Sequence, residues 1–134
     1  MNLKIILLIN AFLFIAGGIA FALYGPLMIA MYGILGAQGD TMLYWYSASF
    51  ARMYGATLFG FGFLIWAASS FSDDLQRGSP TRRSVILAMI LANGMGLFVS
   101  ITQQVSIWGN MTGWITTGLY ALLLLVYTIS LFAR

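Results

Sequence analysis

The chain has 134 residues, of which 61% are hydrophobic and 7% are charged, and its formal net charge is +3 at pH 7. A water-soluble domain of this length needs more polar side chains to cover its surface. The composition therefore excludes a soluble domain and indicates an integral membrane protein. Because the sequence has no Cys and no His, it also excludes disulfides, thiolate nucleophiles and histidine-ligated haem.

Long apolar runs predict membrane-spanning helices. A helix needs about 20 apolar residues to cross the hydrocarbon core. The runs at 5–9 and 122–126 are continuous and lack the alternation of membrane β-strands. We therefore predict an all-α, single-domain bundle of four transmembrane helices, with spans at about residues 4–24, 47–69, 84–105 and 113–132.

The first predicted helix stops at Gly25-Pro26, a typical helix end. Its apolar run also fits a secretory signal with a cleavage site at 20–22, but we expect it to remain as a permanent helix. Residues 27–31 are apolar yet too short to cross, and Gly33 follows them. We predict a short interfacial helix between the first two spans; a re-entrant hairpin is the alternative.

The basic residues predict the orientation of the four spans. A polar linker at residues 72–83 separates the second and third spans, and a tight turn at 109–112 separates the last two. In this topology Arg52 alone lies on the outer side, and the inner side holds Lys4, Arg77, Arg82, Arg83 and Arg134. Basic loops stay in the cytoplasm. We therefore expect both termini to be cytoplasmic, in a bacterial inner membrane.

Small residues at regular spacing predict where helices pack closely. Lipid removes most of the hydrophobic drive between helices, so close backbone approach must replace it. The third span carries such a stripe at four-residue spacing, made of Ala88, Ala92, Gly96 and Ser100. The second span carries two shorter stripes, one of Ser47, Ala51 and Gly55 and one of Ala56 and Gly60, and the fourth span carries Gly113, Thr117 and Ala121. These stripes either meet inside the bundle or dock a partner, and we favour internal packing for most of them.

Arg52 is the main candidate for a functional side chain, because ionisable residues within membranes usually face a bundle interior or a cavity. Three roles are open: a structural anchor, a site for an anion or lipid headgroup, and a side chain that reaches the outer headgroups. The polar groups expected at the same level are Asp40, Gln103 and Gln104.

Two amides fall in the inner halves of their spans. We predict that Asn10 and Asn93 form an amide bridge between the first and third helices, with a ligand contact as the alternative. Asp73 and Asp74 alone would bind a metal only weakly. We identify no catalytic residue, cofactor or metal site, and expect no nucleic-acid partner.

The segment from Arg52 to Gly62 reads RMYGATLFGFG, an Arg followed by an aromatic-Gly pair and a Gly-rich apolar run. It resembles a pattern in a family of small, uncharacterised bacterial four-helix membrane proteins. Residues 16–18 and 25–27 are similar to the first span of that family and its Gly/Pro exit. The resemblance implies a four-helix fold and draws attention to Arg52, but brings no known activity.

These observations favour a non-catalytic accessory or scaffold subunit of a larger membrane complex. It would pack against partner helices, membrane lipids or pigments, or associate with itself. The alternative is a small transporter or channel component in which Arg52 contacts an anionic substrate or a lipid headgroup.

Overall fold

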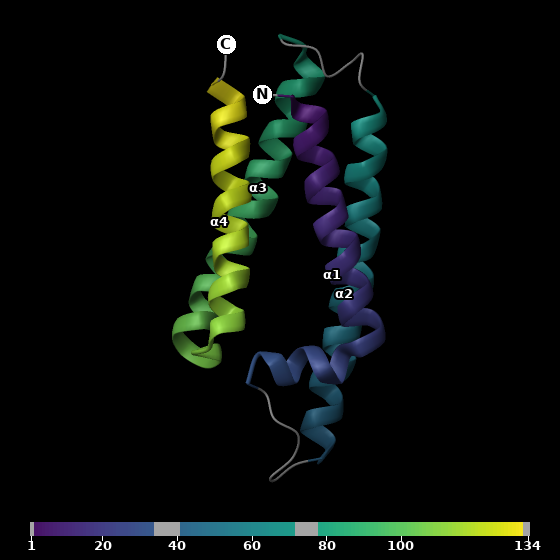
Figure 1. Cartoon of the computed structure of the whole chain (residues 1–134), viewed down its shortest axis with the longest axis vertical. Coiled ribbons are helices and arrows are strands. Elements are labelled where there is room, and N and C mark those ends of the chain that lie inside the picture. The colour runs from purple at the N-terminus through teal and green to yellow at the C-terminus, as the bar shows by residue number, and fades with distance from the viewer. Residues whose placement is uncertain (1, 34–40, 72–77, 133–134) are drawn as a thin grey trace. The chain divides into compact units, whose positions relative to one another are not determined.

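The structure, a computed structural model, describes residues 2–33, 41–71 and 78–132. Within these ranges the regular structure is helical throughout, and no strand is present. A short π-helix, Gln104–Trp108, separates the last two of four long α-helices: α1 (Leu3–Met31), α2 (Thr41–Ser70), α3 (Pro80–Gln103) and α4 (Met111–Phe132) (Figure 1). The prediction of an all-α fold with four long helices is confirmed.

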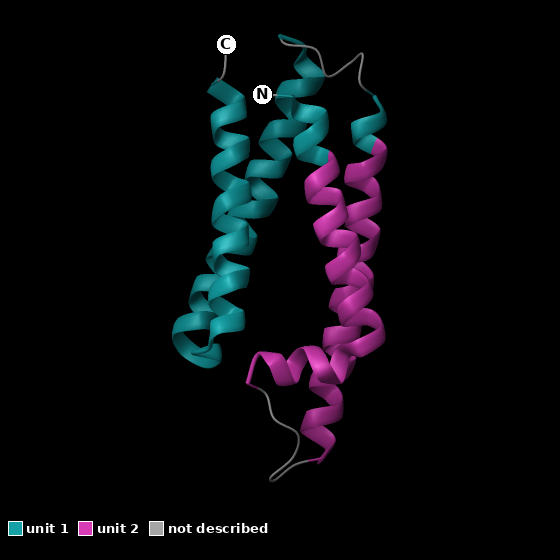
Figure 2. Cartoon of the chain, viewed as in Figure 1, with its two compact units in different colours: residues 1–7, 68–134 teal, residues 8–67 magenta. Residues whose placement is uncertain are grey.

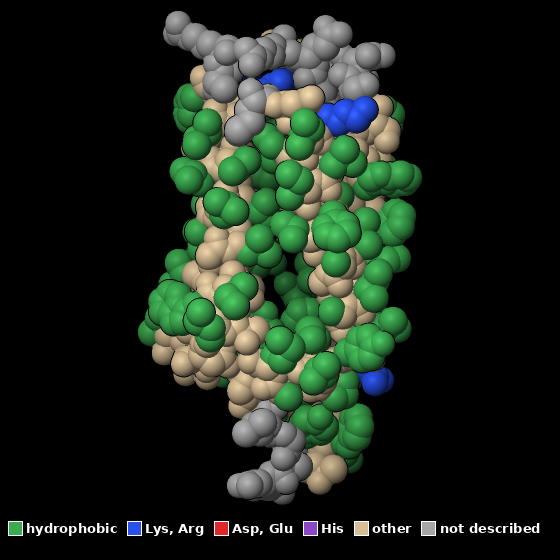
Figure 3. Space-filling view, viewed as in Figure 1, with side chains coloured by type: hydrophobic (Ala, Val, Ile, Leu, Met, Phe, Trp, Pro, Cys, Tyr) green, Lys and Arg blue, Asp and Glu red, His purple; other side chains and the backbone are tan. Residues whose placement is uncertain are grey.

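All four helices are long and apolar enough to cross a membrane. Their most apolar windows have mean hydropathies of 2.5, 1.2, 2.1 and 1.9 in chain order. Hydrophobic side chains predominate on the face drawn in Figure 3, where Lys and Arg are few. The helices are thus consistent with a membrane protein in length and composition, while membrane insertion and its direction stay predictions.

The chain divides into two compact units (Figure 2). One unit, residues 8–67, contains most of α1 and α2. The other combines residues 1–7 with residues 68–134, and so contains α3, the π-helix and α4. Each unit is described by itself below.

Helix α1 bends sharply near its end. Tyr24 leaves helical geometry, with φ −115° and ψ 33°, two residues before Pro26. Proline lacks the N–H that would reach the carbonyl of Ala22, and its ring clashes with that carbonyl, so the helix breaks here. The last turns run crosswise to the first part of α1 (Figure 1). A separate helical segment thus follows the predicted stop signal, and its place in a membrane interface remains a prediction.

Helix α3 begins earlier than its predicted span. The Ser79 hydroxyl accepts a hydrogen bond from the backbone N–H of Arg82 at 3.1 Å, which caps the helix, and Pro80 occupies the first turn. Residues 80–83, the last part of the predicted polar linker, are therefore helical. Arg82 and Arg83 lie in the first turn of α3.

The turn between α3 and α4 is built from a π-helix and a left-handed glycine. The N–H of Gly109 donates to the carbonyl of Gln104 at 3.2 Å, which closes the wide turn. Gly109 then has φ +56°, a conformation that glycine adopts without strain. The Asn110 side chain caps α4 by accepting from the N–H of Gly113 at 2.9 Å.

Candidate functional site

Helices α1 and α2 meet along two rows of small residues. Within each row the residues are seven positions apart, the period of helices that pack side by side over many turns. All of them are buried. We call these rows the small-residue seam; it consists of Ala11, Gly18 and Gly25 on α1 and Ala48, Gly55 and Gly62 on α2.

The seam brings the two backbones into direct contact. A Cβ atom added at Gly18 would lie 2.5 Å from the backbone nitrogen of Phe59 and 2.8 Å from the carbonyl oxygen of Gly55. A Cβ atom at Gly55 would overlap the backbone of Ala22. Because backbone atoms cannot move aside as side chains do, these positions require glycine.

The register of the seam makes the helices antiparallel. At one end Gly62 faces the carbonyl of Ala11, and at the other end Gly25 faces the carbonyl of Ala48. Two aromatic pairs flank the seam: Phe14 with Phe61, at 5.8 Å between ring centroids, and Phe21 with Tyr54, at 5.3 Å in an edge-to-face arrangement.

The predicted stripes on α2 differ from the seam that the structure shows. Gly55 belongs to the seam, while Ala51 is half-buried. Gly60 is exposed, and a Cβ atom added there would have no neighbour within 4 Å. A search at four-residue spacing misses the seam, whereas the seven-residue period in both segments reveals it.

Arg52 lies beside the bend of α1. Its stem covers Gly25, where an added Cβ atom would be 2.9 Å from Cγ and 3.6 Å from Nε of the arginine. The side chain as a whole is exposed. Of its predicted companions, Asp40 lies outside the described residues, and Gln103 and Gln104 belong to the other unit. The grouping of these residues stays a prediction.

Gln104 is the centre of a polar corner between α3 and α4. The side chain is buried, and its Nε2 donates to the carbonyl of Asn110 at 3.1 Å. Its Oε1 lies against Gly113, where any Cβ atom would collide with it. The Gln104 side chain thus links the start of α4 to the C-terminal end of α3. The neighbouring Gln103 is half-buried.

A buried hydroxyl pair joins the same two helices. Ser100 and Thr117 are 2.6 Å apart between their oxygen atoms. Thr117 donates its one hydroxyl hydrogen to the carbonyl of Gly113 at 2.9 Å, so Ser100 is the donor to Thr117. The predicted α3 stripe therefore contains a polar bridge at its end.

The remaining members of the α3 stripe have different surroundings. Gly96 faces the ring of Tyr120, and an added Cβ atom would collide with that ring. Ala92 is half-buried and Ala88 is exposed. The contact with α4 thus includes the later half of the predicted stripe, from Gly96 to Ser100.

The two predicted amide partners are both buried. Asn93 donates from Nδ2 to the carbonyl of Met89 at 2.8 Å, within its own helix. Asn10 belongs to the unit of residues 8–67, and Asn93 to the unit that includes residues 68–134. The predicted bridge between them remains a prediction.

Among residues 2–33, 41–71 and 78–132, no group of three or more His, Cys, Asp or Glu side chains is placed to hold a metal. All three acidic residues of the chain, Asp40, Asp73 and Asp74, lie outside these ranges. No protein-family model matches the chain, and neither curated proteins nor solved structures include a similar one.

Proposed function

We propose that this chain is a non-catalytic accessory or scaffold subunit of a membrane complex. Four helices cross a bacterial inner membrane, with both termini in the cytoplasm, and one helix face receives a helix of another subunit. The observation that carries the proposal is the open face at Ala56 and Gly60 of α2, which we call the α2 groove.

The α2 groove is distinct from the seam that α1 covers. Successive residues of a helix are about 100° apart, so Gly60 lies about 140° around α2 from Gly55. Ala56 and Gly60 are four residues apart and both are exposed. Apart from the adjacent residues and the nearby backbone of α2 itself, no atom lies within 4 Å of a Cβ atom added at Gly60. In lipid, paired small residues of this kind let another helix approach closely.

The amino-acid composition supports a role without catalysis. His and Cys are absent, and only 7% of residues are charged. Histidine is the commonest general acid or base and cysteine is a strong nucleophile, and the chain has neither. A scaffold subunit needs shape and small residues, which the seam and the α2 groove supply.

The proposal is tested by gentle detergent extraction from the native membrane, followed by native mass measurement. The wild-type chain of 14.7 kDa should be found in a complex with a partner subunit. Gly60→Leu should release that partner because the new side chain fills the groove. Gly118→Leu is the matched control, since Gly118 is exposed on α4 with no neighbour within 4 Å.

Two results would contradict the proposal. One is a wild-type chain that travels alone after the gentlest extraction. The other is an equal loss of partner from both glycine variants, which would mean that the groove has no special role. A mass that is a multiple of 14.7 kDa would identify the partner as a second copy of the chain.

A transporter or channel component is the second candidate, favoured by the place of Arg52 at the bend of α1. Non-helical backbone at membrane depth is tolerated where it is buried in protein or lines a water-filled cavity, and the second case would suit a transport path. In this case Arg52→Ala should abolish anion flux into proteoliposomes while the mass of the complex stays unchanged. Unchanged flux would exclude the second candidate.

A further inference from the structure

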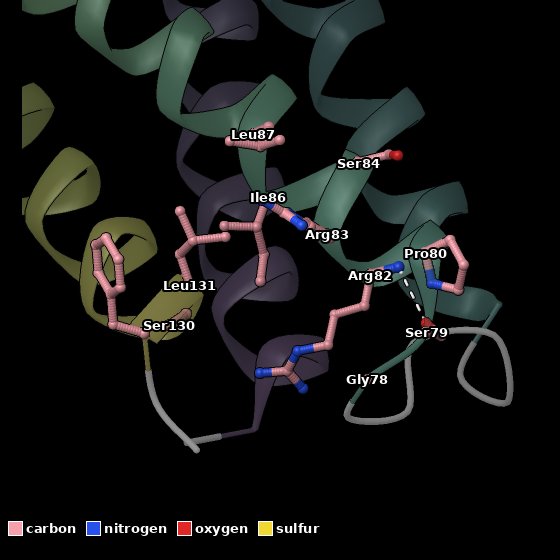
Figure 4. Close-up of a pocket in the computed structure, with 11 residues that line it drawn as sticks. Gly78, Ser79, Pro80, Arg82, Arg83, Ser84, Ile86, Leu87, Ser130 and Leu131 are labelled. Carbon is pink, nitrogen blue, oxygen red and sulfur yellow. Dashed lines mark hydrogen bonds between the residues drawn. The ribbon is translucent and has the colours of Figure 1, made fainter.

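A pocket of about 790 Å³ opens between the first turn of α3 and the last turn of α4, which belong to one unit (Figure 4). Sequence reasoning treats its basic residues only as charges that set orientation. The lining has a polar part and an apolar part. The polar part includes Ser79, Arg82, Arg83, Ser84 and Ser130, and the apolar part includes Ile86, Leu87, Leu131 and Phe132.

Arg82 gives the pocket its chemistry. Its side chain runs from α3 in the direction of the end of α4 (Figure 4), yet the residue is only 9% exposed. Among the described residues, the backbone N–H of Arg82 donates a hydrogen bond to the Ser79 hydroxyl, and no acidic side chain lines the pocket. A buried guanidinium is costly unless an anion compensates its charge.

The surroundings of Arg82 also favour an anion. Arg83 lines the same pocket and is exposed, so it adds a second positive charge at the rim. The pocket lies at the N-terminal end of α3, a helix of 24 residues, where the helix dipole is positive.

We propose that this pocket binds a phosphate group and that Arg82 is its main contact. A planar guanidinium donates two parallel hydrogen bonds to phosphate oxygens, a geometry that lysine cannot reproduce. The phosphate comes from a lipid headgroup or from a free anion. The apolar wall of Leu131 and Phe132 suits the lipid, since it would contact the glycerol and the first methylenes. This inference stands whether or not the proposed function holds.

The test measures binding to the purified full chain in a neutral detergent by native mass spectrometry. The probes are phosphatidylglycerol, phosphatidylcholine and inorganic phosphate. Arg82→Gln should weaken phosphatidylglycerol binding by about tenfold or more, since it removes a buried charged donor. Arg83→Gln is the matched control: it removes the same charge from an exposed position, and should weaken binding by less than about threefold.

The probes also distinguish the two sources of phosphate. Binding of phosphatidylglycerol that depends on Arg82, without binding of inorganic phosphate, would identify a lipid site. Binding of both with the same dependence would identify a phosphate site that needs no lipid chains. Equal binding of phosphatidylglycerol and phosphatidylcholine, or equal loss in the two arginine variants, would overturn the proposal.

Two further variants keep the test decisive. If Arg82→Gln does not fold, as judged by far-UV circular dichroism, Arg82→Lys replaces it and should still weaken binding because it lacks the paired donors. The Asp73→Asn/Asp74→Asn double variant tests whether linker carboxylates occupy the pocket. If it bound phosphate and the wild type did not, Arg82 would be neutralised within the chain and the proposal would fail.

Discussion

Adjacent glycines of α1 have opposite surroundings, and this gives a sharp test of the seam. Gly18→Ala places a methyl group against the backbone of α2 and should lower the free energy of unfolding by about 1–3 kcal/mol. Gly17→Ala meets no neighbour within 4 Å and should be neutral, or stabilising by up to about 1 kcal/mol through helix propensity. Denaturant titration in mixed micelles measures both. Equal effects at the two positions would rule out the backbone contact.

The hydroxyl pair of α3 and α4 makes a second prediction at this scale. Ser100→Ala removes the donor and leaves Thr117 bonded to the carbonyl of Gly113, so the cost should be about 0.5–1.5 kcal/mol. Thr117→Val should cost more, because it leaves the buried Ser100 hydroxyl without its acceptor.

A double-mutant cycle on the same pair isolates the interaction energy in detergent micelles. It should give a coupling near the average for buried polar pairs between membrane helices, about 0.6 kcal/mol. Additive effects of Ser100→Ala and Thr117→Val would show that the two hydroxyls do not interact.

At the scale of the elements, the bend of α1 depends on Pro26. Pro26→Ala restores an N–H that can bond to the carbonyl of Ala22, so α1 should straighten. Spin labels at the exposed positions Phe12 and Met31 report this directly, and the chain has no native Cys to remove. Their backbone separation should increase toward about 28 Å, the rise of a straight helix over that interval. An unchanged separation would show that contacts of Gly25, not proline, hold the bend.

The existence of the helices could be predicted from the sequence, because apolar runs and Gly/Pro stops depend on neighbouring residues only. The start of α3 could also have been found, since Ser79-Pro80 is a typical cap and first-turn pair. It was harder to predict which face of each helix contacts another helix. At four-residue spacing Gly55 and Gly60 look equivalent. Of the two, Gly55 alone belongs to a row of small residues seven positions apart, and it is the one that α1 covers.

The surroundings of the basic side chains could not be predicted as the helices could, for a physical reason. Arg82 and Arg83 are adjacent and identical in type, yet one is buried in a pocket and the other is exposed. That difference arises from the direction in which each side chain leaves α3 and from the nearby end of α4. Composition and residue spacing alone do not predict such tertiary surroundings.

At the scale of the whole molecule, the asymmetry of basic residues predicts one orientation. Reporters fused after Arg77 and after Arg134 should both be cytoplasmic, and one inserted at Gly109 should be external. Paired alkaline phosphatase and fluorescent protein fusions measure this, since the first is active outside and the second fluoresces inside. Opposite locations for the first two fusions would disprove the four-span topology.

The seven-residue repeat has a consequence for sliding of α1 along α2. A shift by one repeat would place Gly25 opposite Gly55 and Phe21 opposite Phe61, so glycine would again face glycine and one aromatic pair would re-form. The other pair would be lost, at about 0.5–1.5 kcal/mol, and Arg52 would leave Gly25. The α1–α2 pair therefore has an alternative register, seven residues away, with similar glycine contacts. The second aromatic pair and the contact of Arg52 with Gly25 favour the observed register over it.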